Sequence, residues 1–161
     1  MSRDQNFKLI SHRGNVFGKF VDRENHPNYI QRALDLGYDV EIDLWYVGRE
    51  WCLGHDGPHY MCSNVSQYLN DSRLWIHCKN VEALVMLEQW PHPIAANYFF
   101  HNTDPVTLTS HNWIWAFPGI KVNSFKSICV MPELVGWNKD NIDNIGFGGV
   151  CSDIIGEFLD D

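Results

Sequence analysis

Strand-type and helix-type segments alternate through the first half of the chain, and this alternation restricts the fold more than any other feature. Apolar runs of strand length occupy residues 7–11, 38–47 and 74–79, and helix-type segments lie between or after them at 27–37 and 80–90. A helix that joins two neighbouring strands makes them parallel, through a right-handed crossover. The sequence therefore predicts an α/β domain with a parallel sheet.

The segment YDVEIDLWYV at 38–47 shows a strict two-residue period. Such a strand sends Val40, Ile42 and Leu44 to one face and the acids Asp39, Glu41 and Asp43 to the other. The carboxylates of Glu41 and Asp43 lie close enough to repel each other unless a proton or a cation lies between them. A hard divalent cation with oxygen ligands is the expected solution.

Beyond residue 93 the pattern changes to short apolar segments that are joined by connections too short for full crossover helices. These segments lie at 94–100, 105–110, 113–117, 127–131 and 148–155. The chain then has six to eight strands, which is typical of a closed barrel, but an ordinary (β/α)₈ barrel takes about 250 residues. We therefore predict one domain over residues 1–161, folded as a compact, reduced TIM-like barrel whose second half has shortened or missing outer helices.

Composition restricts the partners and the compartment. The net charge of −8 gives no overall electrostatic reason to bind nucleic acid or an anionic membrane. The chain contains neither a signal-type apolar segment nor a run of membrane-spanning length, so we expect a soluble cytoplasmic protein. Five cysteines without a C-x-x-C pair indicate neither a disulfide framework nor a zinc cage. Strands that lack covering helices would expose apolar surface, which predicts a homo-oligomer.

Polar residues follow the predicted strands at their carboxyl ends. His12 and Arg13 follow the first strand, Glu41 and Asp43 lie late on the second, and Lys79 closes the third. In parallel α/β folds the loops at this edge are free to vary while the sheet holds their anchors, so catalytic groups collect there. The sequence therefore predicts a catalytic site at this edge.

The order of these motifs resembles the glycerophosphodiester phosphodiesterase family, which is part of the phospholipase C-like phosphodiesterase superfamily. The shared motifs are HRG at 12–14, EN at 24–25, EID at 41–43, HDG at 55–57 and the lysine of HCK at 77–79. The resemblance is strongest over residues 8–80. It becomes fainter towards GVCSD at 149–153, which looks like the family's last strand and its following aspartate.

The resemblance implies a metal-dependent phosphodiester hydrolase of lipid metabolism that acts on a small glycerophosphodiester-type substrate. One histidine would deprotonate the attacking hydroxyl or water and the other would protonate the leaving alkoxide, which suits a side chain whose ordinary pKa is about 6.5. The resemblance leaves open which histidine is the acid. Carried onto this sequence, it assigns acid–base catalysis to His12 and His55, binding of Mg²⁺ or Ca²⁺ to Glu41 and Asp43, and phosphate binding to Arg13 and Lys79.

The chain departs from the family at His77, where the family usually has a third metal-binding glutamate. A neutral imidazole can ligate a divalent metal, but it adds no negative charge and favours a softer ion than Mg²⁺ or Ca²⁺. His77 is the predicted third ligand, and Asp56, Glu133 and Asp153 are acids at other predicted strand ends that could complete the site instead. The departure also supports an alternative function, a phosphate- or phosphodiester-binding module that has lost efficient turnover.

Some of the candidates also have structural interpretations. Glu24 and Asn25, the family's EN pair, could simply cap the helix that starts at Pro27. The aromatic cluster at 113–117 is expected to pack in the core, although its member Trp115 could instead face the barrel mouth and contact the substrate.

Overall fold

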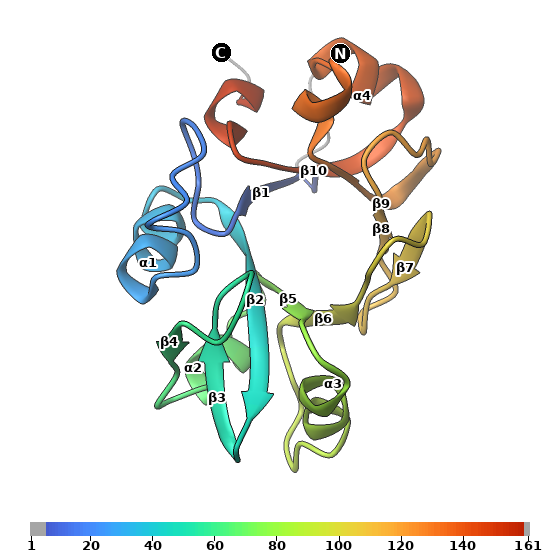
Figure 1. Cartoon of the computed structure of the whole chain (residues 1–161). Helices are drawn as coiled ribbons and strands as arrows, with labels where there is room; N and C mark the ends of the chain where they lie inside the picture. Colours follow the sequence, from blue (N-terminus) through green and yellow to red (C-terminus); the bar gives the residue numbers. More distant parts are fainter. Residues whose placement is uncertain (1–5, 160–161) are drawn as a thin grey trace.

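Ten strands form a single curled sheet within residues 6–159, the part of the chain that the computed structural model describes (Figure 1). The sequence predicts only six to eight strands, and the additional strands include a short hairpin extension within residues 50–61. The strands are β1 (Lys8–His12), β2 (Asp39–Val47), β3 (Glu50–Leu53), β4 (Tyr60–Met61), β5 (Leu74–Cys78), β6 (Asn97–Phe100), β7 (Val106–Leu108), β8 (Ile114–Ala116), β9 (Ser124–Val130) and β10 (Phe147–Ser152).

Most of the sheet is parallel, as the alternation of strands and helices predicts. β1 lies between β2 and β10, β2 also pairs with β5, and parallel pairing continues from β5 to β6 and from β10 through β9 to β8. Only β3, β4 and β7 join the sheet in antiparallel pairs. The register sets His12 beside Glu41 and Asp43 beside His77, so the candidate residues of three strands meet at one edge.

The sheet curls so far that β6 comes beside the segment that contains β7. The backbone N–H of Ser110 donates to the carbonyl oxygen of Tyr98 at 2.9 Å, and the Thr109 hydroxyl donates to Asn97 Oδ1 at 2.6 Å. The molecule is therefore a mixed α/β structure around a strongly curled sheet.

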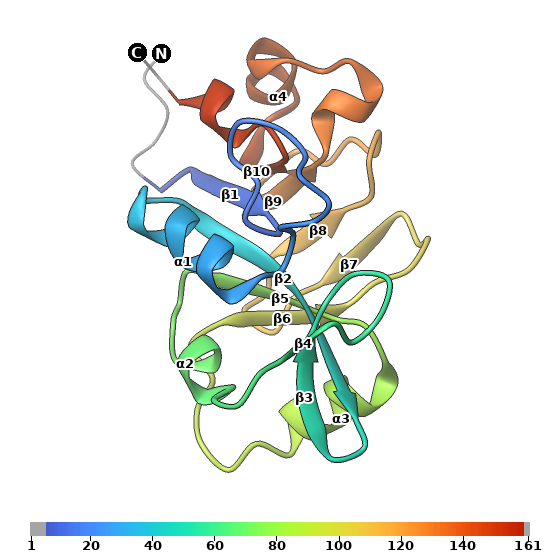
Figure 2. The ribbon, with the colours of Figure 1, turned by 60° about the vertical axis from the view of Figure 1, so that its left-hand side comes forward.

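The few helices lie mainly outside the first half of the sheet and beside its last strands (Figure 2). Between β6 and β9 the described chain forms no helix, which agrees with the short connections in the sequence. None of the described helices has the length and apolar character needed to cross a membrane. The helices are α1 (Pro27–Asp35), α2 (Ser66–Leu69), α3 (Val81–Glu88) and α4 (Lys139–Ile145), with single 3₁₀ turns η1 (Pro132–Val135) and η2 (Ile155–Phe158).

The helix α1 forms within the helix-type segment at 27–37 and buries one face, which consists of Tyr29, Ile30, Ala33 and Leu34. Its N-cap is His26, whose ring accepts a hydrogen bond from the backbone N–H of Asn28 at 3.1 Å. The interpretation of Glu24 and Asn25 as caps was therefore wrong. Both residues precede the cap, and their side chains are turned inwards to other partners that are described below.

Two hydrophobic cores hold the sheet. The larger core lies between the sheet and the helices and includes Val40, Ile42 and Leu44, the predicted apolar face of β2. The smaller core lies on the other face, the one that carries the acids of β2, and it includes Trp75, Phe99 and Trp115. Trp115 is only 4% exposed, and its ring centroid lies 4.6 Å from that of Phe99. Trp115 is thus a core residue, and the structure does not place it at the mouth.

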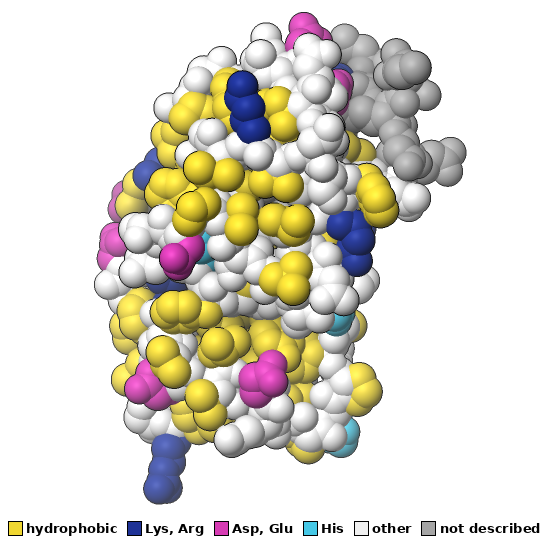
Figure 3. All heavy atoms as spheres, turned by 90° about the vertical axis from the view of Figure 1, so that its right-hand side faces the viewer, with side chains coloured by type: hydrophobic (Ala, Val, Ile, Leu, Met, Phe, Trp, Pro, Cys, Tyr) yellow, Lys and Arg dark blue, Asp and Glu magenta, His cyan; other side chains and the backbone are white. Residues whose placement is uncertain are grey.

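The outer face over β7, β8 and β9 carries broad patches of hydrophobic side chains (Figure 3). On β7, the side chains of Val106 and Leu108 are 42% and 61% exposed, and on β9 that of Phe125 is 83% exposed. This is the part of the sheet where the described chain has no helix, so exposed apolar surface occurs where the sequence analysis expected it.

Candidate functional site

His12, the last residue of β1, is oriented by the acid that follows β10. Its Nδ1 lies 2.7 Å from Asp153 Oδ1, and its Nε2 lies 3.9 Å from Glu41 Oε2. Burial by itself opposes ionisation of Asp153, but the hydrogen bond and charge of His12 and a hydrogen bond from Asn15 outweigh it and lower the pKa of Asp153. A carboxylate on Nδ1 leaves Nε2 as the nitrogen that can exchange a proton with a substrate.

Asn15 links His12's partner to the rest of the site. Its amide nitrogen donates to Asp153 Oδ1 at 2.8 Å and to Glu24 Oε1 at 3.0 Å, and its amide oxygen accepts from the Tyr29 hydroxyl and from the Phe20 backbone, both at 3.1 Å. The side chain is fully buried. The role of Asn15 could not be predicted from the sequence, because one amide in a loop has no periodicity; its position directly after HRG is the only signal.

Arg13 is fixed by carboxylates on two sides. Its Nη1 donates to Glu24 Oε2 at 3.1 Å, and its Nε lies 3.0 Å from Asp43 Oδ2, an ion pair without the alignment of a hydrogen bond. Its backbone has a φ of 59°, in the left-handed region that costs a non-glycine residue energy. Strain of this kind persists where surrounding contacts impose it, often at functional sites.

Asn25, the second residue of the EN motif, is hydrogen-bonded to Asp43. Its amide nitrogen donates to Asp43 Oδ2 and its amide oxygen accepts from the backbone N–H of Asp43, both at 2.8 Å. Asn25 also adopts a left-handed φ of 62°, and its backbone N–H donates to the carbonyl of Arg13 at 3.0 Å. Glu24 and Asn25 therefore position Arg13 and Asp43.

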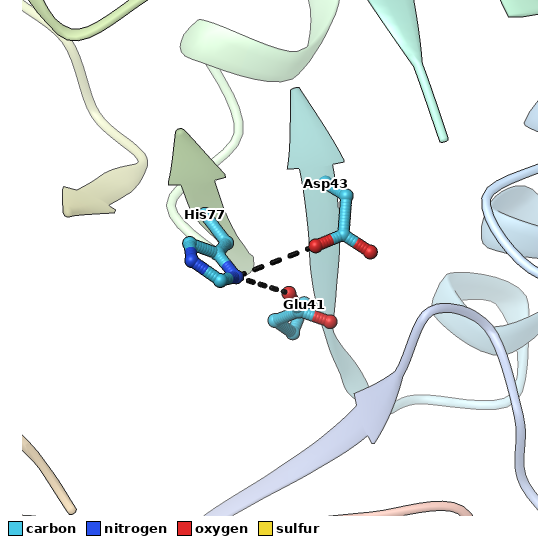
Figure 4. Close-up of side chains that lie close together, drawn as sticks. All are labelled: Glu41, Asp43 and His77. Atoms are coloured by element: carbon cyan, nitrogen blue, oxygen red, sulfur yellow. Dashed lines mark ion pairs between the residues drawn. The ribbon is translucent and has the colours of Figure 1, made fainter. Parts of the chain in front are cut away.

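Glu41, Asp43 and His77 converge at the centre of this edge (Figure 4). His77 Nδ1 lies 3.3 Å from Asp43 Oδ1 and 3.8 Å from Glu41 Oε1, and one possible ligand atom from each residue lies within 4.8 Å of the others. Glu41 Oε2 and Asp43 Oδ1 are both buried and accept no hydrogen bond from the described chain. Orphaned acceptors of this kind are rare in folded proteins unless an ion or water completes them.

The pKa values of the two carboxylates shift in opposite directions, although burial opposes the ionisation of both. Burial and the neighbouring charge of Asp43 raise the pKa of Glu41 well above its usual range. Burial also acts against ionisation of Asp43, but His77, Arg13 and Lys79 outweigh it and lower the pKa of Asp43. Lys79 contributes from the end of β5, with its Nζ 3.7 Å from Asp43 Oδ1.

These residues fit a divalent cation. Ligand bonds of about 2.0–2.2 Å hold neighbouring ligand atoms roughly 3 Å apart, close to the separation of His77 Nδ1 and Asp43 Oδ1. When Glu41 is ionised, the carboxylates of Glu24, Glu41, Asp43 and Asp153 also outnumber the permanent cations, Arg13 and Lys79. A phosphodiester anion would therefore meet excess negative charge here unless a further cation is present.

The other acids proposed as third ligands lie elsewhere. One Glu133 oxygen accepts from the Ser152 hydroxyl and from the backbone N–H of Asp153, both at 2.9 Å, so Glu133 supports the residue that orients His12. Asp56 is 80% exposed and its Oδ1 lies 2.7 Å from His55 Nδ1. Among the described residues, the group suited to a metal consists of Glu41, Asp43 and His77.

His55 lies on a tight loop beside the same charges. Gly54 has a φ of 147°, and a Cβ there would overlap the carbonyl oxygen of Gly57, so this turn requires glycine. Burial, together with the charges of Arg13 and Lys79, lowers the pKa of His55 against the opposing charge of Asp43. The charges at the centre of the site therefore affect the pKa of His55, although its side chain is 39% exposed.

No protein-family model, curated protein sequence or solved structure matches the chain. Its function therefore has to be inferred from the side chains at this edge of the sheet.

Proposed function

We propose that the protein is a divalent-metal-dependent phosphodiester hydrolase related to the glycerophosphodiester phosphodiesterases, built on a reduced TIM-like barrel. The observation that carries the proposal is the convergence, at one edge of the curled sheet, of a carboxylate-supported histidine, two fixed cations and a carboxylate–imidazole cluster suited to a metal. The mainly parallel sheet with helices outside its first half supports the barrel. The substrate class is a small glycerophosphodiester.

His12 and His55 perform the proton transfers in this proposal. Each ring has a carboxylate oxygen 2.7 Å from Nδ1, which leaves Nε2 as the working nitrogen. One imidazole takes a proton from the attacking group, which is water or a hydroxyl of the substrate itself. The oxygen of this attacking group bonds to phosphorus as it loses the proton. The other imidazole gives a proton to the departing alkoxide as the old phosphorus–oxygen bond breaks. General acid–base catalysis of this kind contributes roughly 10²–10⁴-fold.

The charged residues bind the phosphate. Arg13 and Lys79 supply permanent positive charge, and both are held within 4 Å of Asp43 by the contacts above. Glu41, Asp43 and His77 would hold a divalent cation, which when bound would offset phosphate charge and favour attack at phosphorus. Glu24, Asn15 and Asn25 hold these groups in place through buried hydrogen bonds.

The test is a hydrolysis assay with the purified protein on glycerophosphodiesters and on a chromogenic phosphodiester. Each substrate is offered with Mg²⁺, Ca²⁺, Mn²⁺ or Zn²⁺, or with a chelator. We expect turnover that the chelator removes and that His12→Ala and His55→Ala each reduce by at least about 10²-fold. His92→Ala, an exposed histidine away from the site, is the matched control and should retain turnover.

Two outcomes would contradict the proposal. Turnover that survives both histidine substitutions would assign the chemistry to other groups. Binding of a glycerophosphodiester without turnover, in every metal, would instead identify a phosphodiester-binding module, which is the alternative that His77 suggests.

A further inference from the structure

We infer that the cation site is built for a first-row transition-metal ion such as Co²⁺ or Zn²⁺ rather than for Mg²⁺ or Ca²⁺, with His77 Nδ1 as a ligand. The inference deepens the proposed function, from which it takes only the presence of a cation. It rests on three features of His77 and its neighbours: the proton position on the ring, the fixed orientation of the ring, and the two buried carboxylates that the ring faces.

The environment of His77 sets which nitrogen carries the proton. Nε2 lies 2.8 Å from the backbone carbonyl oxygen of His101, which can only accept a hydrogen bond. In the neutral ring Nε2 therefore holds the proton and Nδ1 presents a lone pair. A backbone carbonyl on the distal nitrogen is a common arrangement for metal-bound histidines, because it fixes both the tautomer and the ring direction.

The ring is also held in orientation. It stacks on Phe99 with centroids 5.2 Å apart and an interplanar angle of 13°. The pairing of β2 with β5 places His77 directly beside Asp43, and its side chain is only 20% exposed. Nδ1 consequently remains directed at the two carboxylates, as Figure 4 shows.

The lone pair faces Asp43 Oδ1 at 3.3 Å and Glu41 Oε1 at 3.8 Å. Glu41 is 2% exposed and Asp43 is fully buried, and Glu41 Oε2 and Asp43 Oδ1 both lack hydrogen bonds. A nitrogen lone pair and two buried carboxylates repel one another unless a proton or a cation lies between them. A divalent cation would balance the two carboxylate charges.

The ligand atoms of the site, two carboxylates and one imidazole nitrogen, determine which cation it prefers. Ca²⁺ takes about six to eight oxygen ligands, and Mg²⁺ requires near-octahedral oxygen coordination. Imidazole nitrogen is instead a preferred ligand of transition ions. Replacing an expected carboxylate by imidazole also removes one negative charge, which weakens the attraction for Mg²⁺ and Ca²⁺.

The experiment measures binding, not turnover. Metal-stripped wild-type protein, His77→Glu and the exposed-site control His92→Glu are titrated calorimetrically with Mg²⁺, Ca²⁺, Mn²⁺ and Zn²⁺. Most nitrogen–oxygen sites bind Zn²⁺ more tightly than Mg²⁺, so the preference of the wild type alone decides nothing. The decisive quantity is the change in the Zn²⁺-to-Mg²⁺ affinity ratio, which we expect His77→Glu to lower by at least about tenfold and His92→Glu to leave unchanged.

A second readout keeps the test valid if His77→Glu does not fold. Nitrogen-15 NMR of the histidine rings should show that Zn²⁺ shifts the Nδ1 resonance of His77 in the wild-type protein and leaves its Nε2 protonated. An unchanged affinity ratio in a folded His77→Glu protein, or a His77 Nδ1 resonance that Zn²⁺ does not move, would overturn the inference. Metal-dependent hydrolysis with either result would show that the proposed function stands without this metal preference.

Discussion

Asp153 connects the candidate site to the stability of the fold through its ionisation. The folded protein lowers its pKa from an unfolded value of about 3.9, chiefly because the contacts with His12 outweigh the burial of the carboxylate. A depressed carboxyl pKa stabilises the folded state above the unfolded pKa, and that stabilisation disappears as the pH falls through the folded pKa. We therefore expect Asp153→Asn to be less stable than the wild type at pH 7, with a difference that shrinks below about pH 4.

Urea unfolding of both proteins at several pH values between 3 and 7 measures this difference. Asp56→Asn is the matched control, because Asp56 also contacts a histidine but is 80% exposed. A stability difference for Asp153→Asn that stays constant down to pH 3 would show that its cause is packing rather than ionisation.

Asn25 combines two separable contributions, its hydrogen bonds to Asp43 and its left-handed backbone. Asn25→Gly and Asn25→Ala both remove the amide and leave buried groups of Asp43 unpaired, at about 1–3 kcal/mol for each group. Alanine adds a left-handed conformational cost of about 1–2 kcal/mol that glycine avoids. Denaturant unfolding should therefore rank the wild type above Asn25→Gly and Asn25→Gly above Asn25→Ala. The reverse order of the two variants would show that backbone strain does not matter here.

At the scale of elements, Asn80 joins the helix α3 to the strand β2. Its amide oxygen accepts from the backbone N–H groups of Ala83 and Tyr46, both at 3.2 Å, and its amide nitrogen donates to the carbonyl of Tyr46 at 2.9 Å. Loss of an N-cap costs about 1 kcal/mol and each further hydrogen bond a similar amount. We expect Asn80→Ala to lower the free energy of unfolding by about 2 kcal/mol.

Asn80→Asp separates the two roles, since aspartate still accepts at the cap but cannot donate to Tyr46. In chemical unfolding, Asn80→Asp should lower the free energy of unfolding by less than Asn80→Ala does. An equal loss would assign the whole effect to the hydrogen bond that Asn80 donates to the carbonyl of Tyr46.

The elements that sequence reasoning predicted well are those with a period or a cap. The alternation in β2 and the helices within 27–37 and 80–90, the second of which Asn80 caps, all appear where expected. The strands β3 and β4 were harder to predict, because the hydrogen bonds that join them to their neighbours produce no recognisable pattern in a Gly- and Pro-containing sequence. The roles of Asn15 and of the His101 carbonyl could not be predicted, since they depend on three-dimensional contacts.

At the scale of the whole molecule, the two halves of the sheet differ in what covers them. Helices α1, α2 and α3 pack near the first half, whereas the described chain places no helix between β6 and β9. The predicted homo-oligomer concerns this second half, since an apolar surface that has no helix of its own can be covered by another copy. The net charge of −8 opposes such contact at low salt, because like molecules repel.

Leu108 on β7 is the position at which to test self-association. Its side chain is 61% exposed, and in the sheet order β7 is a terminal strand. We expect light scattering to show wild-type association that increases with protein concentration and with salt, and Leu108→Lys to shift the protein towards monomer because the buried ammonium would be desolvated. Val21→Lys is the control, since Val21 is 64% exposed on the loop between β1 and α1 and lies outside this face. A wild-type monomer at high concentration and salt, or equal dissociation by both variants, would contradict an interface over β7–β9.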